Sequence, residues 1–269
     1  IALQKQMAAR VRPDDPFDGT TVRLVAGVDV SVKRDENGQR QSRAAVVVLT
    51  FPELAVVETV RWQMPTPYPY IPGLLTFREG PVLAEAFRLL RHEPDVFIFD
   101  GMGIIHPRRI GIAAHMGLWL ERPTIGVGKT HLLGDYETPP DERGAWSPLI
   151  DHDQLLGAVL RSREGVKPIY VSSGHRMNLP AALEMVKKYL GDDGLKQMHF
   201  HMSGIAYSAK GEREHVPLNE ADLHYRDLLQ AFVDYGVEGT VGVEAPLPFH
   251  VADALTLQAT YRRLRGVGV

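Results

Sequence analysis

Three valine-rich segments near the start of the chain constrain its fold more than any other feature. They cover residues 22–32, 43–51 and 54–62, and the first two are joined by a polar turn at Asn37-Gly38. Asn-Gly supplies the positive φ angles of a tight hairpin turn, and β-branched runs of this length favour strands. We therefore expect an antiparallel meander of three strands.

Helical and strand patterns alternate after the meander. Apolar residues at helical spacing predict helices over residues 81–91, 110–120 and 179–190, and short apolar runs bounded by Pro or Gly predict strands over 95–99, 123–127, 155–160 and 168–171. A meander followed by alternating helices and strands is typical of an α/β fold with a mixed sheet flanked by helices.

The segment 191–194, Gly-Asp-Asp-Gly, is the best candidate for a domain boundary because two glycines and two acids stand in four residues. We expect one domain over residues 1–192 and a second segment over 193–269. Strands are predicted at 198–203 and 240–244, and helices at 222–235 and 251–265. The second segment is therefore expected to be an α/β appendage of two strand–helix units.

Composition excludes several classes of site. The chain has 269 residues and no cysteine, which rules out disulfides, thiolate metal sites and cysteine nucleophiles. Its formal net charge is −3, so any contact with nucleic acid must come from local basic patches. No stretch approaches the roughly 20 uncharged apolar residues that span a bilayer. We expect a cytoplasmic protein with no membrane partner.

Three carboxylates stand at unusual positions. Asp29 lies inside an apolar strand, Asp100 closes the apolar run 96–99 before Gly101, and Glu79 is expected to open a helix. Any one of them alone is more simply a surface acid or a helix cap. Two acids in apolar strands need partners, because an unpaired buried carboxylate is costly. A cluster of hard oxygen ligands suits Mg²⁺ or Mn²⁺ and the displacement of phosphate esters.

Basic and aromatic residues accompany these acids. The run 106–109, His-Pro-Arg-Arg, follows Asp100, and Lys129 follows a predicted strand. Positive side chains beside carboxylates can position a phosphate, although a solvated basic face is an equal alternative. Residues 67–73, Pro-Tyr-Pro-Tyr-Ile-Pro-Gly, form either an ordinary packed loop or an apolar wedge for a base stack.

Taken together, these motifs resemble the endonuclease V family from about residue 22 to residue 190. The matching segments are Gly-Val-Asp-Val at 27–30, Pro-Tyr-Ile-Pro-Gly at 69–73, Phe-Arg-Glu at 77–79, Asp-Gly-x-Gly at 100–103, His-Pro-Arg-Arg-x-Gly at 106–111, Gly-Val-Gly-Lys at 126–129 and the stretch 165–175. Chance is a poor explanation for so many motifs in this order.

The resemblance implies an RNase H-like fold and a Mg²⁺-dependent repair nuclease that accepts Mn²⁺ as a substitute. Members recognise deoxyinosine in double- or single-stranded DNA, and some recognise inosine in RNA. They cut the second phosphodiester on the 3′ side of the lesion and leave a 3′-hydroxyl and a 5′-phosphate. A monomer is expected.

The resemblance also assigns roles to individual residues. Asp29, Glu79 and Asp100 match the metal-binding acids, and Lys129 matches an active-site lysine that stabilises charge on the phosphate. Tyr70 and Pro72 belong to the wedge that holds the gap open when the damaged base flips out. The residues matching the base pocket are Gly73, Leu75, Gly101, His106 and Gly126.

Two departures from the family pattern concern the same site. Met102 stands where the family usually has His or Gln. The family run that follows Tyr189, and that ends in a fourth acidic or histidine ligand, is absent. Residues 246–253 imitate that run at both prolines and at Ala-Asp, so Asp253 could supply the fourth ligand.

From about His199 onward the chain is similar to the end of an endonuclease IV-like TIM barrel, a zinc-dependent abasic-site nuclease. His199, His215 and Glu244 fall near zinc-ligand positions of that family. About 75 residues cannot close a barrel that needs about 200, so we favour a docked appendage without a working zinc site. The alternatives left open are a lesion-binding protein that cuts weakly and an abasic-site nuclease acting through the tail.

Overall fold

The computed structural model describes residues 1–190, 197–202, 204–208, 211–216, 225–234, 238–243 and 250–266. The chain divides into two compact units, residues 1–190 and residues 191–269. Among the described residues, no helix has both the length and the apolar character needed to cross a membrane.

The first unit is built on one mixed sheet of eight strands in the order β3-β2-β1-β4-β5-β8-β7-β6. Strands β1, β4 and β5 run parallel, while the other neighbouring pairs are antiparallel. The strands are β1 Leu24–Arg34, β2 Arg40–Thr50, β3 Val56–Pro65, β4 Val96–Asp100, β5 Thr124–Gly128, β6 Trp146–Asp151, β7 Gln154–Leu160 and β8 Ile169–Ser173. The predicted meander and mixed sheet are confirmed.

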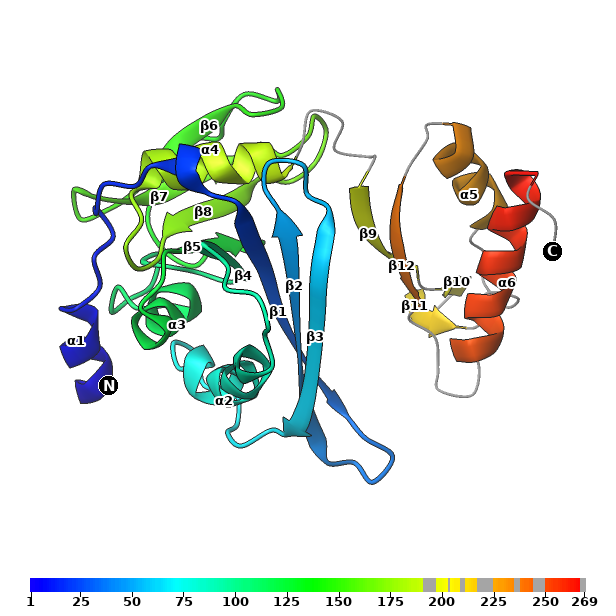
Figure 1. Ribbon diagram of the computed structural model, residues 1–269, viewed down its shortest axis with the longest axis horizontal. Helices are drawn as coiled ribbons and strands as arrows, with labels where there is room; N and C mark the ends of the chain where they lie inside the picture. Colours follow the sequence, from blue (N-terminus) through cyan, green and yellow to red (C-terminus); the bar gives the residue numbers. More distant parts are fainter. Residues whose placement is uncertain are drawn as a thin grey trace. The chain divides into compact units, whose positions relative to one another are not determined.

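Helices cover both faces of this sheet (Figure 1). Helices α2, Leu75–Arg88, and α3, Ile112–Leu120, pack on one face against Val28, Phe97 and Phe99. Helix α4, Leu179–Tyr189, packs on the other face against residues such as Val25 and Ile98. Helix α1, Ala2–Ala8, and a short 3₁₀ turn, Gly19–Thr21, precede the sheet. Because side chains alternate along a strand, β1 and β4 contribute apolar residues to the hydrophobic cores on both faces of the sheet.

Three details of the first unit differ from the sequence-based expectation. Helix α2 begins at Leu75 rather than at Pro81, so Glu79 lies within the helix and does not open it. Pro is favoured in the first turn of a helix, which made Pro81 a misleading start signal. Helix α1 was not predicted, and neither was β6, where Pro148 interrupts the strand pattern at the edge of the sheet.

The second unit contains both predicted strand–helix pairs. Strands β9, Gln197–Met202, and β12, Glu238–Val243, pair in parallel, with α5, Tyr225–Asp234, between them in sequence and α6, His250–Leu264, after them. The hairpin of β10, Gly204–Ser208, and β11, Gly211–Val216, was not predicted. The expected boundary at 191–194 lies outside the described residues.

Candidate active site

Strand register brings two of the predicted acids together. In the parallel pair β1–β4, Val28 is opposite Phe99, so Asp29 and Asp100 are the next residues along the two neighbouring strands. Side chains alternate between the faces of a sheet. Asp29 therefore shares a face with Val25, and Asp100 shares the same face with Ile98, which is the face that α4 covers. Both carboxylates project from this face.

Lys129 lies beside the two aspartates, just beyond the end of the next strand of the sheet, β5. It follows β5, in which Val127 is opposite Asp100. Its Nζ donates to Asp100 Oδ2 at 2.6 Å. That hydrogen bond, together with the charges of Asp100 and Asp29, raises the pKa of Lys129 despite partial burial. The lysine is therefore a firmly protonated cation at the edge of the carboxylates.

Glu79 approaches from α2. Burial, opposed by the neighbouring Arg78 and assisted by the charges of Asp29 and Asp100, raises its pKa to about 7. We call Asp29, Glu79 and Asp100 the carboxylate cluster. Its members influence each other electrostatically even though they come from three separate elements, and their negative charge is only partly balanced.

The cluster fits a divalent cation by its chemistry. Its donors are all carboxylate oxygens, which hard cations prefer, and an added positive charge would relieve the repulsion that Glu79 experiences. Within the described part of the chain, no three His, Asp or Glu side chains already converge on one point. Asp100 holds Lys129 through Oδ2, but an ionised carboxylate can accept from several partners at once.

The loop at residues 66–74 joins β3 to α2 (Figure 1). Its tip is exposed as expected, with Tyr70 61% and Ile71 40% accessible. The guanidinium carbon of Arg78 lies 5.6 Å from the centre of the Tyr70 ring, a cation–π distance. This contact connects the aromatic tip to the helix that carries Glu79. The described loop is thus an exposed aromatic projection rather than a segment packed into the core.

Close backbone approach explains the glycines predicted to line a pocket. A Cβ on Gly126 would overlap the backbone nitrogen of Gly103, so β5 lies directly against the segment after β4. Gly101 has φ +149, and a Cβ there would lie 2.6 Å from the side chain of Ile112. Both glycines therefore lie where the protein packs closely on itself and a side chain would not fit.

The remaining predicted pocket residues lie around the base of the loop. Leu75 is the first residue of α2. The carbonyl of Gly73 accepts from His106 Nε2 at 3.1 Å, while His106 Nδ1 accepts from the backbone N–H of Arg108 at 3.1 Å. Burial lowers the pKa of His106 to about 4. The ring is therefore neutral, with its proton on Nε2, and both nitrogens bond to the protein.

Met102 departs from the family pattern beside the cluster. Its Sδ lies 2.6 Å from the point a Cβ on Gly128 would occupy, and its side chain packs against the apolar cluster that includes Ile105 and Tyr170. A large thioether thus covers the strand end immediately before Lys129. The absence of a side chain at Gly128 makes room for it.

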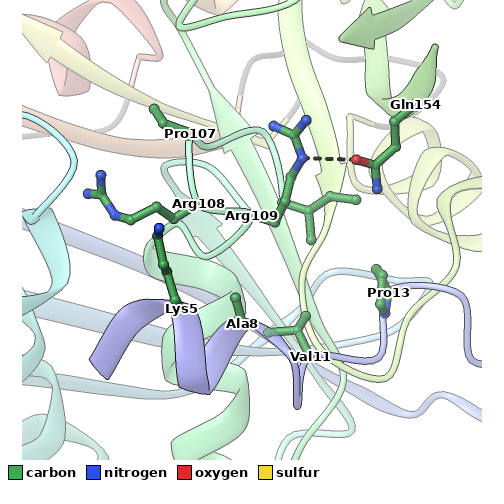
Figure 2. A pocket seen from close by; sticks show the side chains of 9 residues that line it. Lys5, Ala8, Val11, Pro13, Pro107, Arg108, Arg109 and Gln154 are labelled. Atoms are coloured by element: carbon green, nitrogen blue, oxygen red, sulfur yellow. Dashed lines mark hydrogen bonds between the residues drawn. The ribbon is translucent and has the colours of Figure 1, made fainter. Parts of the chain in front are cut away.

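A groove of about 420 Å³ lies beside α1 and the loop 104–109 (Figure 2). Lys5, Arg108 and Arg109 surround it, and Arg109 donates to Gln154 at 3.0 Å and to Asp151 at 2.6 Å. None of the residues predicted for the base pocket lines this groove. Part of the predicted basic run 106–109 therefore forms hydrogen bonds within the protein and is not free for a phosphate.

The predicted ligands of the tail are only partly described. Asp253 lies in α6 and is buried. His199 lies in β9 and His215 in β11, whereas Glu244 falls outside the described residues. A role for any of them in metal binding stays a prediction.

Comparison with known proteins matches the first unit to one family. The family model described as Endonuclease V covers residues 5–195. Endonuclease V of Trichormus variabilis is 48% identical over 186 residues, which are 69% of this chain and 82% of that protein. The crystal structure of endonuclease V from Bacillus subtilis aligns with a TM-score of 0.67 and 32% identity, covering 70% of this chain and 80% of that one.

A further solved structure shows a relative with DNA. Ciona intestinalis endonuclease V, in complex with a 24mer DNA containing an inosine, aligns with a TM-score of 0.60 and 27% identity over 70% of this chain and 86% of that one. The mixed sheet and its flanking helices thus define a nuclease with an RNase H-like fold. The chain belongs to the Endonuclease V family of DNA repair endonucleases.

Proposed function

We propose that this protein is a Mg²⁺-dependent endonuclease that recognises deoxyinosine in DNA and hydrolyses the second phosphodiester 3′ to it. The products are a 3′-hydroxyl and a 5′-phosphate. The observation that carries the proposal is the strand register that sets Asp29 beside Asp100, with Lys129 bonded to Asp100 and Glu79 near enough for both aspartates to raise its pKa. The DNA of the Ciona relative, which contains inosine, supports the choice of substrate.

Each residue of the site has a chemical task in this proposal. Asp29, Glu79 and Asp100 would hold Mg²⁺, or Mn²⁺ in its place, and the ion would supply Lewis-acid stabilisation of the phosphate. Lys129 donates a charge-assisted hydrogen bond from a position fixed by Asp100. It can thereby place positive charge on a non-bridging phosphate oxygen as negative charge develops there.

Recognition of the lesion is assigned to the loop and the glycine-rich edge. Tyr70, with Pro72 stiffening the loop, would enter the base stack after the base flips out. Gly101 and Gly126 would line the pocket for the flipped purine, at an edge where a side chain would not fit. Gly73, Leu75 and His106 complete the proposed pocket, with His106 acting through the backbone that it holds.

For the rest of the chain, we propose a nuclease domain over residues 1–192 and a tail over 193–269 that resembles part of an endonuclease IV-like barrel. A role for Asp253 as a metal ligand stays a prediction. Activity on inosine in RNA, a monomeric state and a cytoplasmic location stay predictions.

The proposal is tested with three end-labelled duplexes that differ at one position: deoxyinosine, deoxyadenosine or an abasic site. Each is incubated with the full chain in Mg²⁺ and separately in Zn²⁺. We expect a nick one nucleotide beyond deoxyinosine in Mg²⁺ and no nick in the deoxyadenosine control. Binding without a nick would show that the active site is incomplete. Cleavage of the abasic duplex alone in Zn²⁺ would assign the activity to the tail.

A further inference from the structure

The carbonyl oxygen of Gly73, at the base of the loop 66–74, accepts three hydrogen bonds. The donors are Gln4 Nε2 at 2.9 Å, His106 Nε2 at 3.1 Å and Arg108 Nη2 at 2.6 Å. Two lone pairs ordinarily serve one or two donors. We call Gln4, His106 and Arg108 the Gly73 anchor.

Two members of the anchor also bond to each other. Arg108 Nε donates to Gln4 Oε1 at 2.7 Å, so the Gln4 amide accepts from the arginine and donates to the glycine. Gln4 is 1% exposed, which is rare for a glutamine. A buried amide is tolerated when both of its ends are paired. The Gln4–Arg108–Gly73 arrangement therefore closes a ring of three hydrogen bonds.

Helix α1 is itself fixed in place. Met7, Ala8 and Val11 pack against a buried cluster that includes Ala114 and Leu118 of α3. Figure 2 shows Lys5 and Ala8 of α1 facing the loop that carries Pro107 and Arg108. Packing of α1 on α3 thus determines where the Gln4 amide lies.

The anchor fixes the loop at its base and leaves its tip exposed. Gly73 has φ +77, and a Cβ there would lie 2.5 Å from Arg108 Nη2. Leu74 donates to the carbonyl of Ile71, which closes a turn immediately beyond the exposed Tyr70. A side chain that must enter a base stack needs a rigid support, because ordering a mobile loop on binding costs free energy and weakens the complex.

We propose that Gln4 is a positioning residue for the proposed inosine-DNA activity: from α1 it holds the Gly73 carbonyl and so sets the angle at which Tyr70 enters the duplex. This inference rests on the proposed function. It assigns a task to an N-terminal helix that contributes no residue to the carboxylate cluster.

The test compares two variants and a control. Gln4→Met keeps the volume but loses both hydrogen bonds, and Gln4→Glu can still accept from Arg108 but cannot donate to Gly73. Leu3→Ala, at an exposed position of the same helix, is the control. Cleavage is measured on a deoxyinosine duplex and on the single strand, where no stack has to be held open. The fluorescence of a 2-aminopurine beside the inosine reports unstacking.

Loss of a buried hydrogen bond corresponds to about tenfold. We expect Gln4→Met and Gln4→Glu to cut the duplex about tenfold more slowly, to cut the single strand within about twofold of wild type, and to give a smaller 2-aminopurine signal. Equal losses on both substrates, or none on the duplex, would overturn the inference. Should wild type cut neither substrate, the proposed function fails, but the 2-aminopurine comparison still decides the positioning role because it requires no cleavage.

Discussion

The carboxylate cluster and the Gly73 anchor use polar groups in opposite ways. In the cluster, the three acids come from β1, α2 and β4, Lys129 donates to one of them, Asp100, and Glu79 holds its proton up to a pH of about 7. In the anchor, a neutral histidine, a glutamine and an arginine satisfy one another around a single carbonyl.

The difference separates a site that binds from a support that positions. Unbalanced negative charge gives the cluster a reason to take up a proton or a cation. Saturated hydrogen bonds give the anchor a single arrangement. If this contrast is right, changes to the cluster alter chemistry, and changes to the anchor alter geometry.

The largest effect is expected at Lys129. Lys129→Gln removes the cation that Asp100 fixes, and loss of one such electrostatic contact to a reacting group costs about 10²–10³-fold in rate. Single-turnover cleavage of the deoxyinosine duplex measures it. The exposed Lys188→Gln serves as the matched control. A rate within twofold of wild type would show that Lys129 takes no part in the chemical step.

Glu79 should make the folded state less stable as the pH rises. Its pKa is raised to about 7 in the folded state from 4.5, so between these values the folded protein holds a proton that the unfolded chain has released, and stability falls with pH. Glu79→Gln should therefore gain up to about 3 kcal/mol over wild type above pH 7, measured by urea unfolding in EDTA.

The exposed Glu184→Gln is the control for that series. A difference between Glu79→Gln and wild type that does not change between pH 4.5 and 7 would mean that the folded protein does not raise the pKa of Glu79.

His106 should make the folded state less stable as the pH falls, which is the opposite of the effect of Glu79. Its pKa is lowered to about 4 in the folded state from 6.5, so below pH 6.5 the unfolded chain takes up a proton that the folded protein refuses, and stability is lost as pH falls toward 4. Urea unfolding of His106→Gln should show a shallower acid loss than wild type, by up to about 3 kcal/mol. The exposed His152→Gln should leave the profile unchanged. Parallel profiles for His106→Gln and wild type would show that His106 is not held neutral.

The same contrast explains what the sequence could predict. An aspartate inside an apolar strand is a local signal, and parallel pairing of β1 with β4 then sets Asp29 beside Asp100. Gln4 and Gly73 are 69 residues apart, and no spacing or composition marks a glutamine in a short helix as the partner of a distant carbonyl. Only the tertiary packing of α1 on α3 creates that contact.

Helix α2 illustrates the other limit. Its apolar face extends back to Leu75, which packs against the core with Val82, but Pro81 suggested a later start. The tertiary contacts of the first turn outweighed the local signal. The sequence therefore placed Glu79 at the wrong point of its helix.

The central claim is that Asp29, brought beside Asp100 by strand register, serves the chemistry and not the recognition of inosine. The most direct test measures cleavage and binding of one deoxyinosine duplex by wild type and by Asp29→Asn. We predict that Asp29→Asn abolishes nicking in Mg²⁺ and binds the duplex with an affinity near that of wild type. Nicking at the wild-type rate would contradict the assignment of the carboxylate cluster as the active site.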